Sequence, residues 1–146
     1  MTPDLVVVAC GAAKQEGRHR ARELYIGSYF RAAMNLADAL SKPTLIISAK
    51  YGLVRTTDLI DSYDVKMGDD GCVQLPTVLR QADLLRLLNR ERVIVLGGMR
   101  YVEFCRNVWP VVWNPAAGPR QGIGRQMATF KRMALQLAER SEEYEL

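Results

Sequence analysis

Histidine and cysteine are scarce in this sequence. It holds a single histidine, His19, and three cysteines at positions 10, 72 and 105, with no C-x-x-C pair among them. Zinc sites in proteins are built mainly from cysteine and histidine at close, paired spacings. The sequence therefore predicts no zinc site, and we expect neither a metal nor another cofactor.

Long apolar runs are also missing. No run approaches the roughly 20 apolar residues that a membrane-spanning helix needs. The first ten residues, MTPDLVVVAC, carry an acidic residue where a signal peptide has its basic start. An unpaired set of cysteines fits a reducing compartment. We expect a cytoplasmic protein that makes no contact with a membrane.

Two well-known nucleotide-binding fingerprints do not occur. The chain has no G-x-G-x-x-G of the dinucleotide-binding folds and no G-x-x-x-x-G-K-[ST] of the P-loop proteins. Both patterns exist because their glycines bring backbone N–H groups close to phosphates. We therefore expect no binding of nicotinamide dinucleotides and no ATP hydrolysis of the P-loop type.

The composition is that of one folded domain. Hydrophobic residues make up 49% of the 146 residues and charged residues 25%, close to the average for soluble globular proteins. A chain of this length suits one ordinary domain with a single core. No linker or low-complexity segment interrupts it. We expect residues 1–146 to form a single domain.

Basic residues outnumber acidic ones slightly. Twenty lysines and arginines stand against 16 acidic residues, which gives a formal net charge of +4. Three arginines and the histidine gather in GRHRAR, residues 17–22, which is either a solvated loop or part of a binding surface. A positive balance favours an anionic partner such as a nucleotide or a nucleic acid.

Four short runs rich in β-branched residues predict strands. They are LVVVA (5–9), TLIIS (44–48), RVIVLG (92–97) and PVVWN (110–114). Continuous apolar runs of this length are typical of strands that are covered on both faces of a parallel sheet. We expect all four to be central strands.

The stretches between these runs have helical spacing. Apolar residues recur every three or four positions in SYFRAAMNLADAL (28–40), LPTVLRQADLLRLLNR (75–90), MRYVEFCRNV (99–108) and RQMATFKRMALQLAER (125–140). Strands and helices thus alternate along the chain. This alternation predicts a three-layer α/β domain, with a mainly parallel central sheet of about four strands and flanking helices.

The segments that follow the strands are the predicted binding loops, because ligands of parallel sheets bind at the carboxyl ends of the strands. CGAAK, SAKYGL, GGMRY and NPAAGPRQGIGRQ each combine small residues with a lysine or arginine. Glycine admits a close backbone approach and the cation completes an anion site. The alternative is that these glycines only form tight turns. The binding residues predicted from these loops are Cys10, Gly11, Lys14, Lys50, Tyr51, Gly52, Gly97, Gly98, Arg100, Tyr101, Gly122, Gly124 and Arg125.

One long segment, residues 54–74, lacks a clear regular element and holds five aspartates. Loops of this length in compact domains are usually functional or mobile. The GDDG stretch at 68–71 suits a simple hairpin tip. The DSYD stretch lies close enough to the second strand to reach the crevice, so Asp64, or else Asp61, is a candidate general acid or base.

Several of these segments together resemble the YaaA family. ELYIGSYF followed by ISAKYGLVRTTDLIDSYDVKMG is similar to its DLYxG and LSxxYGxLxPxDxxxPYxxxMG segments. Short phage and bacterial domains of unknown function in the same superfamily are more similar still. Their shared motifs fall on Cys10 and Lys14, Leu24, Tyr25 and Phe30, Ile47 to Leu53, Tyr63 and Asp64, Gly98 and Tyr101, then Gly122 and Gly124. The chain departs from YaaA proteins in lacking most of their C-terminal half and the proline after YGxL, where Thr56 or Thr57 stands.

The resemblance implies a protein directed at nucleotides or nucleic acids. YaaA-type proteins are associated with DNA binding and with protection of DNA during peroxide stress. The short domains occur near nucleic-acid modification functions and are similar in outline to base-handling glycosidases and transglycosylases. A phage-encoded member would act in the cytoplasm of the host.

The first hypothesis is an N-glycosidase-like hydrolase or transferase that acts on a nucleotide or on a modified base in DNA. Cleavage of an N-glycosidic bond needs a carboxylate near the sugar and donors that hold the base and the phosphate. Asp64 or Asp61 is the expected carboxylate, and Ser48 positions a water or a sugar hydroxyl. The residues expected to contact base or phosphate are Tyr25, Tyr51, Tyr101, Lys14, Lys50, Arg100 and Arg125, and the motif adds Tyr63 to the site.

The second hypothesis is a protein that binds a nucleotide or DNA without chemistry, in a sequestering or DNA-protecting role. It uses the same basic loops and aromatic side chains. A third idea makes Cys10 a nucleophile, against the alternative that this cysteine is buried and inert.

Overall fold

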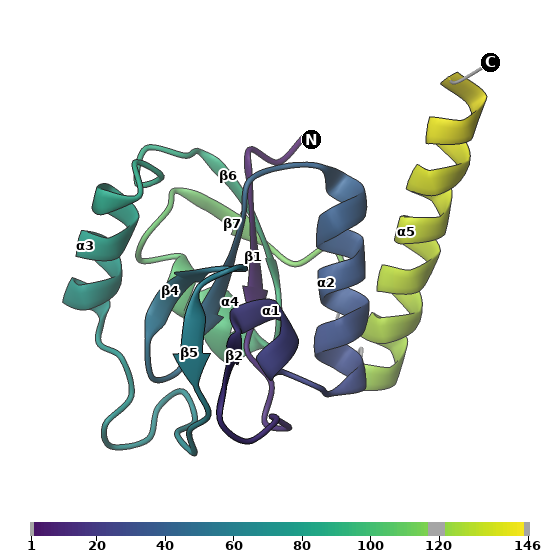
Figure 1. Cartoon of the computed structure of the whole chain (residues 1–146). Helices are drawn as coiled ribbons and strands as arrows, with labels where there is room; N and C mark the ends of the chain where they lie inside the picture. Colours follow the sequence, from purple (N-terminus) through teal and green to yellow (C-terminus); the bar gives the residue numbers. More distant parts are fainter. Residues whose placement is uncertain (1, 117–121, 145–146) are drawn as a thin grey trace.

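The computed structural model describes residues 2–116 and 122–144 (Figure 1). Within these residues, five strands form the main sheet, in the order β4-β3-β1-β6-β7. Neighbouring strands pair in parallel except β4, which is antiparallel to β3. The strands are β1 (Leu5–Ala9), β3 (Thr44–Ser48), β4 (Gly52–Arg55), β6 (Arg92–Leu96) and β7 (Val111–Trp113).

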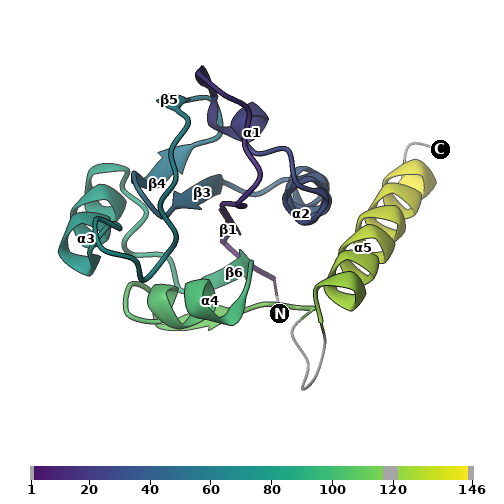
Figure 2. The ribbon, with the colours of Figure 1, turned by 90° about the horizontal axis from the view of Figure 1, so that it is seen from below.

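Helices cover both faces of this sheet. On one face lie α2 (Ser28–Leu40) and α5 (Ile123–Tyr144), and on the other lie α3 (Leu75–Leu84) and α4 (Met99–Cys105) (Figure 2). Because strand side chains alternate between faces, Val6 and Val8 of β1 pack with α2, whereas Leu5 and Val7 pack with α3 and α4. The predicted three-layer α/β domain with a mainly parallel sheet is confirmed.

A second, two-stranded sheet was not predicted. In it β2 (Arg18–Arg20) pairs antiparallel with β5 (Leu59–Asp61), and the short helix α1 (Ala21–Leu24) follows β2 directly. The basic segment is therefore a strand with exposed arginines. The three residues of β2, Arg-His-Arg, are exposed or half-exposed and show no alternation of apolar and polar side chains. Their own pattern therefore does not predict a strand, and the pairing depends on the partner segment.

Two expectations about the strands were wrong. The last predicted strand, β7, is an edge strand, with Val111 exposed and Trp113 half-buried, because the chain continues into α5 and places no further strand beside it. The segment 54–74, expected to lack a regular element, contains the end of β4, which forms a hairpin with β3, and also β5. Gly52 permits this turn, since its φ of +77° is unfavourable for residues with a side chain.

The third helix is shorter than its apolar pattern predicts. It ends at Leu84 because Arg86 adopts a left-handed conformation with a φ of +60°. No helix within residues 2–116 and 122–144 has the length and apolar character required to cross a membrane.

Candidate functional site

The strand order reverses between β1 and β6. The strand that follows β1 in the main sheet, β3, lies on one side of this pair, and the strand that follows β6, β7, lies on the other. From β1 the chain runs through α2 on one face to β3, and from β6 it runs through α4 on the opposite face to β7. At such a switch point the loops leave the two strands toward opposite faces and open a crevice at their carboxyl ends. A cavity of about 220 Å³ lies at this point.

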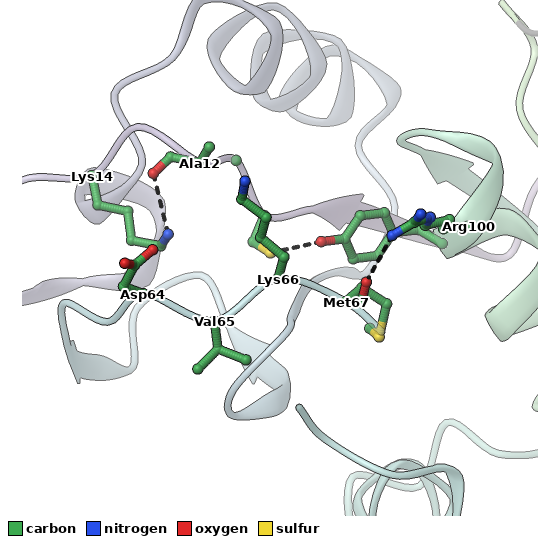
Figure 3. A pocket seen from close by; sticks show the side chains of 10 residues that line it. Ala12, Lys14, Asp64, Val65, Lys66, Met67 and Arg100 are labelled. Carbon is green, nitrogen blue, oxygen red and sulfur yellow. Dashed lines mark hydrogen bonds between the residues drawn. The ribbon is translucent and has the colours of Figure 1, made fainter. Parts of the chain in front are cut away.

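Three chain segments line the cavity (Figure 3). The loop after β1, the loop after β5 and the first turn of α4 each contribute a wall. The lining residues are Cys10, Gly11, Ala12, Lys14, Asp64, Val65, Lys66, Met67, Arg100 and Tyr101. Segments about 90 residues apart in the chain thus meet through the sheet topology.

Gly97 brings the ends of β1 and β6 together beneath the cavity. It is buried, and a Cβ atom at this position would overlap the Cβ of Ala9. Its carbonyl accepts a hydrogen bond from Nδ2 of the buried Asn114, at 2.8 Å. Gly97 is therefore explained by strand packing, whereas the next residue, Gly98, is exposed at the start of α4 with open space around it.

Positive charge dominates the cavity. Lys14, Lys66 and Arg100 line it, against one carboxylate, Asp64, among the described lining residues. None of the three cations forms an ion pair within the described part of the chain. Their contacts are with neutral groups: Lys14 Nζ donates to the carbonyl of Ala12 at 3.2 Å, and Arg100 donates to the carbonyl of Met67 at 3.2 Å. The cavity is therefore suited to an anion.

A buried hydroxyl network supports the wall that carries Asp64. Ser48 is fully buried, accepts hydrogen bonds from the backbone N–H groups of Lys50 and Tyr51, and donates to the Tyr63 hydroxyl at 2.8 Å. The hydroxyls of Tyr63 and Tyr25 lie 2.6 Å apart. Burial raises the pKa of Tyr25 to about 12 and also raises the pKa of Tyr63, so both are neutral at physiological pH.

This network changes the predicted role of Ser48. A fully buried hydroxyl with three hydrogen bonds does not meet a water or a sugar, and it does not line the cavity. Tyr25 and Tyr63 are likewise outside the cavity lining. All three residues hold the Asp64 wall in place.

Cys10 lines the cavity and is half-buried. Its Sγ lies 3.2 Å from the hydroxyl of Tyr101. Burial raises the pKa of Tyr101, so this hydroxyl stays protonated and is available as a hydrogen-bond donor. The Cys10 sulfur and the Tyr101 phenol together add a polar part to the cavity wall.

Several predicted site residues lie elsewhere. The turn of the β3–β4 hairpin contains Lys50, Tyr51 and Gly52. There the Lys50 ammonium lies 5.2 Å from the centre of the Tyr51 ring. Asp61 pairs with Arg18 on the exposed small sheet, at 3.2 Å. None of these residues lines the cavity, because the β3–β4 hairpin holds the first three and Asp61 lies on β5 of the small sheet.

The described residues of the fourth predicted loop are also absent from the cavity lining. Gly122 precedes α5, while Gly124 and Arg125 lie in its first turn, and all three are exposed. Residues 117–121 of that loop lie outside the described residues.

Sequence reasoning missed Lys66 and Met67, although both belong to the cavity. In an extended segment, residues two apart project to the same side. Lys66 follows Asp64 at this spacing, a signal that would have identified it. Within the described residues, no group of three or more His, Cys, Asp or Glu side chains is placed to hold a metal ion.

Comparison with known proteins gives one family match and one curated relative. The sequence model of a "Family of unknown function (DUF6884)" matches residues 5–132, a range that contains the whole cavity. "Uncharacterized protein YfjM" of Bacillus subtilis (strain 168) is 26% identical over 140 residues, covering 87% of this chain and 85% of that protein. No solved structure gives a significant match. The chain therefore belongs to the DUF6884 family.

Proposed function

We propose that the protein is an N-glycosidase-like hydrolase or transferase that acts on a nucleotide or on a modified base in DNA. The observation that carries this proposal is the cavity at the switch point, where three cations without an ion pair and one carboxylate stand among the described lining residues. The resemblance of its motifs to YaaA-like domains supports the same substrate class. Cys10, Lys14, Asp64 and Tyr101 belong both to those motifs and to the cavity.

The cations suit the phosphate of a nucleotide. Arg100 presents a planar fork of donors that matches phosphate oxygens in pairs, and the two lysines act as point charges. One nitrogen of Arg100 is engaged on the Met67 carbonyl, which fixes the orientation of the guanidinium and leaves its other donors for a ligand.

Asp64 suits the reacting sugar. When an N-glycosidic bond breaks, its electron pair leaves on the base and positive charge develops at the sugar C1′ carbon. A carboxylate beside C1′ stabilises that charge and accepts a proton from the attacking water. The net reaction adds the hydroxyl of water to C1′ and a proton to the base. In a transferase, an acceptor base takes the place of water.

Release of a free base is the direct test. The protein is incubated with nucleoside monophosphates and with DNA that contains normal or modified bases, and released bases are identified by mass spectrometry. We expect Asp64→Asn to abolish release while affinity, measured by calorimetry, changes little. Asp61→Asn is the matched control, because that carboxylate pairs with Arg18 outside the cavity, and it should retain activity.

The same experiment separates an enzyme from a binding protein. If the unaltered protein binds nucleotides or DNA and no base is ever released, the proposed reaction is wrong and the cavity only holds its ligand. A steep loss of affinity with salt would then indicate a strand with several phosphates, and a shallow loss a mononucleotide.

A further inference from the structure

An open groove of about 490 Å³ adjoins the cavity. The two hollows share Met67 and Arg100, so a ligand anchored in the cavity can extend past these residues. One side of the groove comes from residues 67–74 and the other from α4 and the residue that follows its C-terminal turn, Asn107. The groove is thus continuous with the proposed phosphate site.

Apart from Arg100, whose guanidinium donates to the proposed phosphate site, the polar side chains Gln74, Glu103 and Asn107 of the groove offer acceptors. Gln74 uses its amide nitrogen on the carbonyl of Cys72, at 3.2 Å, and Asn107 uses its own on the carbonyl of Glu103, at 3.1 Å. These bonds leave the two amide oxygens to accept. The exposed carboxylate of Glu103 forms no ion pair among the described residues, and it adds further acceptor capacity.

The remaining surface of the groove is apolar. Phe104 is half-buried against the core and also lines the groove, next to the buried Met67. A flat aromatic ligand can pack on such a surface, since stacking on an aromatic side chain contributes about 1–3 kcal/mol for a nucleobase. The groove therefore joins an apolar surface to a set of acceptors.

We propose that this groove binds the base of a mononucleotide whose sugar phosphate occupies the cavity, and that it selects bases with an exocyclic amino group. This inference rests on the proposed function. Adenine, cytosine and guanine present amino donors that match the acceptors of the groove. Uracil and hypoxanthine present a carbonyl oxygen at the corresponding position, which places acceptor against acceptor and leaves polar groups unpaired.

Pairs of nucleotides that differ in this one group test the inference. Dissociation constants of AMP and IMP, and of CMP and UMP, are measured by calorimetry on the full chain. We expect the amino-bearing member of each pair to bind at least about tenfold more tightly. Glu103→Gln should reduce that ratio severalfold, because it replaces one carboxylate oxygen by a donor. Glu139→Gln, on the exposed part of α5, should leave the ratio unchanged.

The outcomes separate this inference from the proposed function. If all four nucleotides bind, lose affinity on Lys66→Ala and show no preference for the amino group, the base selection is wrong and the phosphate site stands. A preference that survives Glu103→Gln undiminished also overturns the assignment of the groove. Failure of all four to bind would overturn this inference, whereas release of a base from DNA would still support the proposed function.

Discussion

The ammonium group of Lys14 lies 4.4 Å from the centre of the Tyr63 ring. The contact joins the loop after β1 to the wall that carries Asp64, the residue that follows Tyr63 in the chain. An aromatic face attracts a cation but does not neutralise it as a carboxylate does. Lys14 is therefore held in position while its charge remains available to a ligand.

Removing one cavity cation should weaken the binding of phosphate-bearing ligands. We expect Lys66→Ala to raise the dissociation constant for a bound nucleoside monophosphate by about tenfold or more, the effect of losing one charge-assisted hydrogen bond. Lys50→Ala is the matched control, since that lysine lies in the hairpin turn outside the cavity. Equal losses for the two variants, measured by calorimetry, would contradict the assignment of the cavity.

The neighbouring glycines Gly97 and Gly98 should differ sharply in how much an alanine substitution destabilises the fold. Gly97→Ala places a methyl group against Ala9 between two buried strand ends, and we expect it to lower the free energy of unfolding by about 1–3 kcal/mol. Gly98→Ala meets open space and has an ordinary φ of −64°, so it should be nearly neutral. Urea denaturation of both variants checks this difference, and similar midpoints would show that the two strands separate easily.

Loss of the Ser48 hydroxyl should destabilise the fold. Ser48→Ala removes the acceptor of two backbone N–H groups and one of the two hydroxyl partners of Tyr63, at a cost of about 1–3 kcal/mol. Adding Tyr63→Phe should then cost less than it does alone, because the shared hydrogen bond is already gone. Ser28→Ala, at the exposed start of α2, is the control. Strictly additive effects in urea denaturation would argue against the network.

Stability should fall in the alkaline range. Burial raises the pKa of Tyr25 from its ordinary value of 10.0 to about 12, so the folded state keeps the proton that the unfolded state loses. The associated stabilisation is complete below pH 10 and disappears as the pH rises to about 12. We expect a loss of up to about 3 kcal/mol from this group. Tyr25→Phe should show a shallower decline in urea denaturation across this range.

The sequence predicted the elements whose local pattern and tertiary environment agree. The bounds of β1 and β3 match their apolar runs, and α2 matches its periodic segment. The edge position of β7 was not predictable from PVVWN, because local apolarity carries no information about how many neighbours a strand has. The hairpin after β3 depends on a clamp from another element, Gln81, whose side chain bonds Leu53 N and Tyr51 O.

The site was predictable where the parallel sheet determines it. The cavity residues that follow strands β1 and β6 are Cys10, Lys14, Arg100 and Tyr101. Their location was predictable because ligands of parallel sheets bind at the carboxyl ends of the strands. The Asp64 wall has no regular structure between Ser62 and Lys66. Long-range bonds place it, including the bond from Val73 N to Ala49 O at 2.7 Å. Such contacts have no local signature in a sequence.

The close approach of Gly97 to Ala9 has a consequence for how relatives of this protein diverge. Beneath the cavity the two strand ends have no spare room, so changes of residue there carry a penalty in folding. Asp64 and Lys66 are exposed on a segment without regular structure, where changes cost little stability. New ligand preferences can therefore arise in the 64–67 segment while the strand ends stay constant.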